Sequence, residues 1–279
     1  MIPVIDTHQH LWKMSQFSRP WIGGVLARDF TLEDYRVETD GLNFEATIYV
    51  ETGVVPEERN DEARWILELQ RQEKSIAGTV IGGDPSSPHF ADTIRAFTSY
   101  PGLKGVRPAI NRSPGQFPLL NEPFLEAMRL LGNHDLCCDL LVSRDDLLEV
   151  AVLAQRHPET RFVLDHCGDP GSTSETRDVW GRNLAMLAHC PNVFCKISGI
   201  VGAVPSGASP QESLAPIILH CAETFGAERL LFGSDWPVLT PHASIAEWKS
   251  LLNALISGWS DEDKHRLYHD NAVRVYRLA

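Results

Sequence analysis

The chain alternates between short apolar runs and longer segments in which apolar residues recur every three to four positions. Eight runs are rich in β-branched and other apolar residues, and they cover residues 4–8, 46–50, 76–82, 103–108, 138–142, 161–165, 193–198 and 230–234. Short, almost continuous apolar runs are typical of strands that are buried on both faces of a parallel sheet. We therefore predict eight strands spread from one end of the chain to the other.

The segments between these runs have the spacing of helices. In residues 61–73 the side chains of Ala63, Ile66 and Leu67 fall on one face, and residues 145–156 show a similar repeat. The runs recur about every 30 residues, the length of one strand with its crossover helix. Eight such units predict a single, distorted (β/α)8 barrel over residues 1–279. The rival fold, an open doubly wound sheet, usually has a glycine-rich turn after its first strand, and this chain has Thr-His-Gln-His there.

Composition and net charge limit the kinds of partner that the protein can bind. The 279 residues carry 25 Lys and Arg against 37 Asp and Glu, a net charge of −12. This balance disfavours binding to nucleic acid or to an anionic membrane, which both need a basic face. No apolar stretch approaches the ~20 residues of a membrane-spanning helix. The start of the chain lacks a signal-peptide pattern, and the six cysteines show no C-x-x-C spacing, so we expect reduced thiols and a cytoplasmic protein.

Polar residues with catalytic chemistry stand where three of the predicted strands end, which is where barrels place their active sites. His8 and His10 alternate along the first strand and so point to the same side. Asp235 ends the eighth strand and can act as a general base, while His166 follows the sixth. Each residue alone is also common in a structural role, as a cap or a buried hydrogen-bonding group. Their joint occurrence, with the first and eighth strands adjacent in a closed barrel, favours an active site.

These motifs resemble the amidohydrolase superfamily, and within it the branch of sugar-lactone and 2-pyrone-4,6-dicarboxylate lactonases. The resemblance covers nearly the whole chain. It is carried by the segments DTHQHLW, PWIGGVLARDF, KGVRP, LDHCGDP, CKISGI and FGSDWPV, which occur in this order and start at residues 6, 20, 104, 164, 195 and 232. It implies a distorted (β/α)8 barrel that hydrolyses a lactone.

The resemblance also implies roles for individual residues. Asp235 would take a proton from the attacking water, and His166 with Arg107 would polarise the lactone carbonyl. His8 and His10 would line the floor of the site, and Trp21, on the loop after the first strand, would cover the ring. For Arg107, an ion pair below the rim is the alternative.

The same resemblance bears on metals. Superfamily members with two metals carry a bridging Lys or Glu on the fourth strand and a His on the fifth, whereas this chain has Arg107 and no His at those places. We therefore expect no two-metal centre. The two cofactor predictions that stay open are no metal requirement and one divalent ion, Zn²⁺ or Mn²⁺, bound by His8, His10 and Asp235 with Glu51 as a fourth ligand. Glu51 could instead bind substrate hydroxyls.

The substrate prediction rests on the small number of basic groups. A pyrone dicarboxylate needs several cations around its carboxylates, and only Arg107, Arg112 and Lys196 are expected near the mouth. Lys196 and Ser198, on one side of the seventh strand, are predicted to bind substrate. Trp12, Trp21 and Trp236, expected at the rim, suit a neutral sugar ring and favour an aldonolactone such as L-fucono- or L-rhamnono-lactone.

Three alternatives remain: a 2-pyrone-4,6-dicarboxylate-type lactonase, a mononuclear metal-dependent amidohydrolase or decarboxylase, and an inactive barrel that only binds a sugar acid. The expected partner is a small lactone, and both a monomer and a homo-oligomer stay open.

Overall fold

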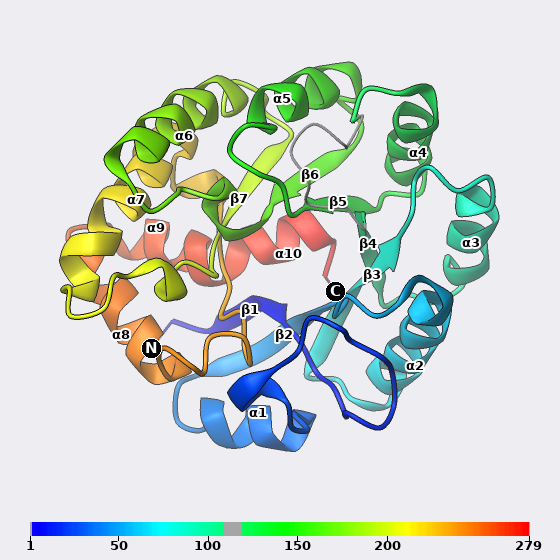
Figure 1. Ribbon diagram of the computed structural model, residues 1–279, viewed down its shortest axis with the longest axis horizontal. Helices are drawn as coiled ribbons and strands as arrows, with labels where there is room; N and C mark the ends of the chain where they lie inside the picture. Colours follow the sequence, from blue (N-terminus) through cyan, green and yellow to red (C-terminus); the bar gives the residue numbers. More distant parts are fainter. Residues whose placement is uncertain (1, 109–118, 279) are drawn as a thin grey trace.

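Eight parallel strands form one sheet that curls into a barrel in the computed structural model, which describes residues 2–108 and 119–278 (Figure 1). Their sheet order follows the sequence: β1 (Val4–Gln9), β2 (Phe44–Val50), β3 (Ile76–Gly83), β4 (Leu103–Pro108), β5 (Cys137–Leu140), β6 (Arg161–Leu164), β7 (Val193–Ile197) and β8 (Leu230–Phe232). Every predicted run overlaps a strand, and the predicted (β/α)8 fold class is confirmed.

Helices surround the strands of this barrel, and the last helix lies across one end of it (Figure 1). They are α1 (Leu32–Thr39), α2 (Arg59–Gln72), α3 (Phe90–Phe97), α4 (Glu122–Asn133), α5 (Leu147–Arg156), α6 (Ser174–Leu187), α7 (Pro210–Phe225), α8 (Ile245–Leu255), α9 (Asp261–His265) and α10 (Asn271–Tyr276). Several begin where a hydroxyl accepts a hydrogen bond from the first turn, as Thr31, Thr173 and Ser244 do. No helix in the described part of the chain is long and apolar enough to cross a membrane.

The core has two parts, because each strand buries both of its faces. Side chains on the outward face of each strand pack against the helices. Side chains on the inward face, such as those of Ile5, Ile48 and Val163, fill the barrel. The last helix, α10, belongs to the inner part: Val275 and Tyr276 pack with these residues. The C-terminal helix therefore closes the end of the barrel that lies opposite the strand C-termini.

The seam between β1 and β8 is held mainly by side chains. A single backbone bridge joins Gln9 to Trp236. The buried Asp6 accepts hydrogen bonds from the backbone N–H and the hydroxyl of Ser234 at 2.8 and 2.5 Å, and the N–H of Asp235 donates to the carbonyl of His8 at 2.8 Å. Residues 233 and 234, predicted as the end of the eighth strand, leave the ladder here because Ser234 pairs with Asp6. The seam places His8 beside Asp235.

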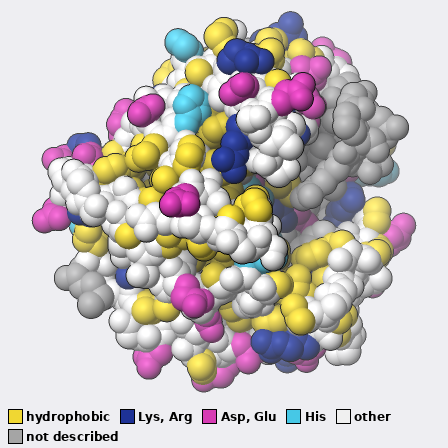
Figure 2. Space-filling view, turned by 60° about the vertical axis from the view of Figure 1, so that its left-hand side comes forward, with side chains coloured by type: hydrophobic (Ala, Val, Ile, Leu, Met, Phe, Trp, Pro, Cys, Tyr) yellow, Lys and Arg dark blue, Asp and Glu magenta, His cyan; other side chains and the backbone are white. Residues whose placement is uncertain are grey.

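Charged side chains are mixed on the surface. On the face drawn in Figure 2, acidic and basic groups lie scattered among apolar and neutral ones, and no large patch of one sign forms. The charge of −12 is therefore not concentrated on that face.

Candidate active site

A cavity of about 800 Å³ opens at the C-terminal ends of the strands. Its walls include six of the residues predicted for the site: His10, Trp21, Glu51, Arg107, His166 and Asp235. Each of these except Trp21 stands at or just beyond a strand end, as the barrel geometry predicts. The residues gathered here come from five different strand ends and one loop.

Asp235 is the centre of the polar cluster in this cavity. Three imidazoles direct their Nε2 atoms at its Oδ1: His10 at 3.5 Å, His8 at 3.6 Å and His166 at 3.9 Å. Burial raises the pKa of Asp235, but the three histidines outweigh burial and hold it well below its ordinary value. Asp235 is therefore an ionised carboxylate throughout the neutral range.

Hydrogen bonds on the far side of two rings fix how they face Asp235. The Nδ1–H of His10 donates to the carbonyl of Val50 at 2.8 Å, which holds the ring with Nε2 directed at the carboxylate. His166 pairs through Nδ1 with the hydroxyl of Ser198 at 2.9 Å. Burial lowers the pKa of His8 well below its ordinary value, so this ring is neutral.

Arg107 and Glu51 form a second, tightly bonded unit in the cavity wall. The Arg107 guanidinium donates through Nε to Glu51 Oε1 at 2.7 Å and through Nη2 to the Glu51 carbonyl at 2.7 Å. The other carboxylate oxygen of Glu51 accepts from the N–H of Gly53 at 2.6 Å. Although burial opposes it, the Arg107 cation lowers the pKa of Glu51. The ion-pair alternative for Arg107 is thus present, while the guanidinium also lines the cavity.

The prediction that Lys196 and Ser198 bind substrate does not match where the structure places them. Both are fully buried, and neither lines the cavity. The Lys196 ammonium pairs with Asp139 at 2.6 Å and with Asp165 at 3.0 Å. Ser198 instead orients His166. Alternation along a strand predicts only the side to which a residue points. Both residues point into the barrel, but they lie below the floor of the cavity.

Asp165 is a hub that the sequence analysis missed. Its carboxylate lies 3.4 Å from His8 Nδ1, 3.0 Å from Lys196 Nζ and 3.3 Å from Arg107 Nη1. Burial opposes ionisation, but Lys196 above all lowers the pKa of Asp165 well below its ordinary value. The sequence did contain a signal for this buried network, because the charged residues Asp139 and Lys196 lie within otherwise apolar strand segments.

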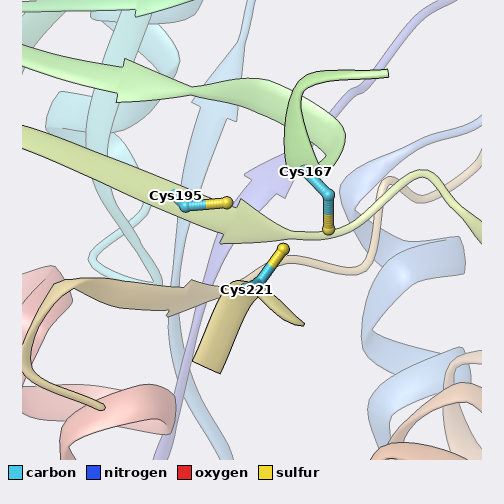
Figure 3. A group of neighbouring side chains, drawn as sticks. All are labelled: Cys167, Cys195 and Cys221. Atoms are coloured by element: carbon cyan, nitrogen blue, oxygen red, sulfur yellow. The ribbon is translucent and has the colours of Figure 1, made fainter. Parts of the chain in front are cut away.

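The turn that carries His166 has an unusual backbone. In η3 (Asp165–Gly168), His166 and Cys167 adopt left-handed φ values of 53° and 56°. Thiols anchor this turn: Cys167 in the turn, Cys195 on β7 and Cys221 on α7 point their sulfurs toward one another (Figure 3). All three are buried and free. Packing behind the turn thus holds His166 in a conformation that non-glycine residues rarely adopt.

The loop between β1 and α1 covers one side of the cavity. Trp21 is 47% exposed, and its indole N–H donates to the carbonyl of Thr52 at 2.7 Å. Arg19 donates to the Thr52 hydroxyl at 2.6 Å, and that hydroxyl donates to the buried Glu62. Trp12 was expected at the rim and is buried instead, packed edge-on against Phe30.

Residues near the rim of the cavity also differ from the expectation. Trp236 was also expected there, and it is buried against Phe30. Arg59 lines the cavity and was missed, because its position just after a 3₁₀ turn gave no catalytic pattern. Arg112 lies outside the described residues.

The donor set at the centre of the cavity fits a divalent metal. His8, His10 and Asp235 each offer one ligand atom, and these atoms lie within 4.8 Å of one another. Two imidazole nitrogens with one carboxylate suit Zn²⁺ or Mn²⁺. Glu51, predicted as a fourth ligand, is not in this group, because Arg107 and Gly53 engage its two carboxylate oxygens. Glu51 as a fourth ligand stays a prediction.

Histidines and an aspartate at the mouth of a (β/α)8 barrel form an enzyme-type site that can activate water. The chain belongs to the amidohydrolase family, whose model matches residues 5–278. It is 31% identical to an L-fucono-1,5-lactonase of Burkholderia multivorans, over 98% of this chain and 96% of the relative. It is 25% identical to a 4-sulfomuconolactone hydrolase of Rhizobium radiobacter, over 97% and 89%. The predicted superfamily is thereby confirmed.

Two solved structures have the same fold as this chain. The crystal structure of an amidohydrolase from Burkholderia multivorans with bound zinc superposes with a TM-score of 0.89 at 30% identity, covering 99% of this chain and all of that one. A probable 2-pyrone-4,6-dicarboxylic acid hydrolase from Acinetobacter baumannii has a TM-score of 0.81 at 15% identity, covering 99% and 100%, and shares the fold.

Proposed function

We propose that this protein hydrolyses the lactone ring of a sugar acid, an aldonolactone of the L-fucono or L-rhamnono type. The observation that carries the proposal is the ionised Asp235 with three imidazole nitrogens directed at it, inside a cavity large enough for a small ring. The names of the relatives support lactone opening. A neutral ring fits a wall in which Glu51 neutralises Arg107.

In the proposed mechanism the chain's own residues bind the lactone and move one proton. The lactone carbonyl lies toward Arg107 and His166, which donate to the oxygen as negative charge develops on it. Water attacks the carbonyl carbon while Asp235 takes its proton. When the ring C–O bond breaks, Asp235 returns that proton to the leaving oxygen, which becomes a hydroxyl. The second water proton stays on the new carboxyl group and passes to solvent at neutral pH, which leaves the open-chain aldonate.

A carboxylate whose pKa is held low is a weak base, so the water must be made more acidic. Bound at His8, His10 and Asp235, a divalent ion would supply Lewis acidity and lower the pKa of water. The ring of His10, held through Nδ1, presents Nε2 to such an ion. We therefore propose one divalent ion, Zn²⁺ or Mn²⁺, as the cofactor.

The test uses wild type and Asp235→Asn against a panel of neutral 1,4- and 1,5-aldonolactones near pH 7, with and without chelator. Loss of a positioned base typically costs about 10²–10⁴ in rate, so Asp235→Asn should lose at least about 100-fold in kcat. Chelation should lower the wild-type rate, and Zn²⁺ or Mn²⁺ should restore it. Lactonase activity that survives in Asp235→Asn would overturn the mechanism, and a wild type that opens no lactone would overturn the function.

An anionic lactone is the second candidate, because one observation favours it. Arg59 lines the cavity and has no ion-pair partner among the described residues, unlike Arg107. An unpaired guanidinium can bind a carboxylate or sulfonate bidentately. The panel therefore includes lactones that carry such a group. A preference for them that disappears in Arg59→Gln would favour the anionic class over the neutral one.

A further inference from the structure

The C-terminal segment carries a second group of metal-ligating side chains, far from the cavity. The C-terminal cluster, as we call it, consists of His265, His269 and Asp270. It lies near Glu45, which stands at the start of β2 and hence at the opposite end of the barrel from the catalytic residues.

An irregular helical turn brings the three side chains together. Between α9 and α10 the chain forms the π-helical turn η6 (Arg266–Asp270), in which the N–H of Asn271 bonds to the carbonyl of Arg266. In a regular α-helix, residues i and i+5 point about 140° apart. The wider turn brings Asp270 to the same side as His265, and His269, four residues on, joins them. π-Turns of this kind occur frequently at functional sites.

Both histidines face a single carboxylate oxygen. Nδ1 of His265 lies 2.9 Å and Nδ1 of His269 lies 2.8 Å from Asp270 Oδ1, and the ring centroids are 5.3 Å apart. Although burial opposes it, the hydrogen bonds from the two histidines lower the pKa of Asp270. Ligands of a tetrahedral Zn²⁺ at about 2.0–2.2 Å lie about 3.3 Å apart. Each of the two nitrogen–oxygen distances therefore has to lengthen by about 0.4–0.5 Å to hold an ion, and the three ligand atoms already lie within 4.8 Å of one another.

We propose that His265, His269 and Asp270 form a second divalent-metal site, of the Zn²⁺ type. The ion takes the place of the two Nδ1 protons that now face Asp270. Each neutral imidazole then carries its single proton on Nε2, so binding to the neutral rings releases no net proton. Solvent completes the coordination sphere, because His265 and Asp270 are 40% and 51% exposed.

Glu45 completes the arrangement as a positioning residue. Its Oε2 lies 3.8 Å from His269 Nε2, the nitrogen that carries the proton when Nδ1 binds the metal. Histidine ligands commonly donate their second N–H to a carboxylate, and losing that partner costs roughly 10- to 100-fold in metal affinity. Arg266, the nearby cation, is already paired with Glu262 and Asp263.

The site would tie the C-terminal segment to the rest of the barrel. The turn η6 packs against β8 and β1, and the helix α10 that follows it fills the lower end of the barrel. Glu45 belongs to β2. An ion held here links the last elements of the chain to the second strand, so we expect it to raise the melting temperature and to leave turnover unchanged.

The experiment measures Zn²⁺ binding calorimetrically on metal-free, full-length protein. All samples carry Asp235→Asn, which weakens the cluster at the mouth and makes any remaining difference attributable to the C-terminal cluster. Adding His269→Gln should lower Zn²⁺ affinity at least tenfold and remove the Zn²⁺-dependent rise in melting temperature. Glu45→Gln, on another element, should lower affinity about tenfold. The matched control is His189→Gln, an exposed histidine whose Nδ1 bonds only to the carbonyl of Ala185.

Unchanged Zn²⁺ affinity in both the His269→Gln and the Glu45→Gln protein would overturn the proposal. An equal loss in His189→Gln would also overturn it, because binding would then be nonspecific. If His269→Gln fails to fold, the Glu45→Gln result decides alone. None of these measurements uses lactone turnover, so the outcome is independent of the proposed activity.

Discussion

Gly199 is the position where the smallest change should disturb catalysis most. It follows Ser198 on the way out of β7 and has a left-handed φ of +63°. A Cβ at this position would lie 2.2 Å from His166 Nδ1 and 2.4 Å from Cγ of the same ring. Non-bonded heavy atoms keep about 3.5 Å, so in Gly199→Ala the ring must move by roughly 1 Å.

Gly199→Ala should lower both the catalytic efficiency and the stability of the protein. A displacement of about 1 Å in a catalytic group can cost about 10²-fold, so kcat/KM should fall about 100-fold. Holding alanine at a left-handed φ costs about 1–2 kcal/mol, so the free energy of unfolding should fall by at least about this amount. The catalytic loss follows from the ring, and the stability loss follows mainly from the backbone.

The assay compares lactone hydrolysis and urea unfolding for wild type, Gly199→Ala and a control, Gly207→Ala. Gly207 has a similar φ of +78°, but a Cβ there meets nothing within 4 Å. The control should show the stability loss and keep wild-type kcat/KM. Gly199→Ala with normal kcat/KM would refute the idea that His166 needs this space. An equal catalytic loss in Gly207→Ala would assign the effect to the backbone.

Three other substitutions test the buried contacts. Lys196→Met removes the cation shared by the buried carboxylates of Asp139 and Asp165 and should cost about 3–5 kcal/mol in urea unfolding at pH 7. Lys196 has a raised pKa, so its contribution is complete at pH 7 and disappears only as the pH rises through that value. The deficit of the variant should narrow between pH 7 and pH 5, as Asp139 and Asp165 take up protons. A deficit that is absent, or constant with pH, would contradict this. Thr52→Val removes the hydroxyl under the Trp21 loop and should cost about 1–3 kcal/mol and raise KM, an expectation that fails if steady-state kinetics show KM unchanged. Arg107→Gln should lower kcat/KM by about 10²–10³, and wild-type kcat/KM in this variant would argue against a role in stabilising the oxyanion.

The fold could be predicted from the sequence because its signal repeats. Each of the eight apolar runs is short and is followed by a helical segment, and the regular spacing predicts a barrel even if one run is misread. The errors lie at the strand ends. Ser234, for example, looked like the last residue of an apolar strand, but its hydroxyl and N–H pair with Asp6, a contact between residues 228 positions apart. Local pattern carries no information about such a partner.

The site could be predicted in part. Strand ends and motif resemblance identified Asp235, His166 and Arg107, and the structure brings them to one cavity. Depth along the barrel axis was the missing quantity: alternation placed Lys196 on the inner side but could not show that it lies below the floor. Asp165 was overlooked for a related reason, since a charged residue at the end of an apolar run looks like a cap until its buried cations are known.

The seam between the first and last strands has a consequence for synthesis of the protein. His8 and His10 leave the ribosome at the start of translation, and Asp235, which completes their cluster, emerges more than 200 residues later. Closing so long a loop comes late because its entropy cost must be met before the contact forms. A nascent chain therefore has no working carboxylate between its histidines. The polar cluster at the mouth is therefore complete only in the finished barrel.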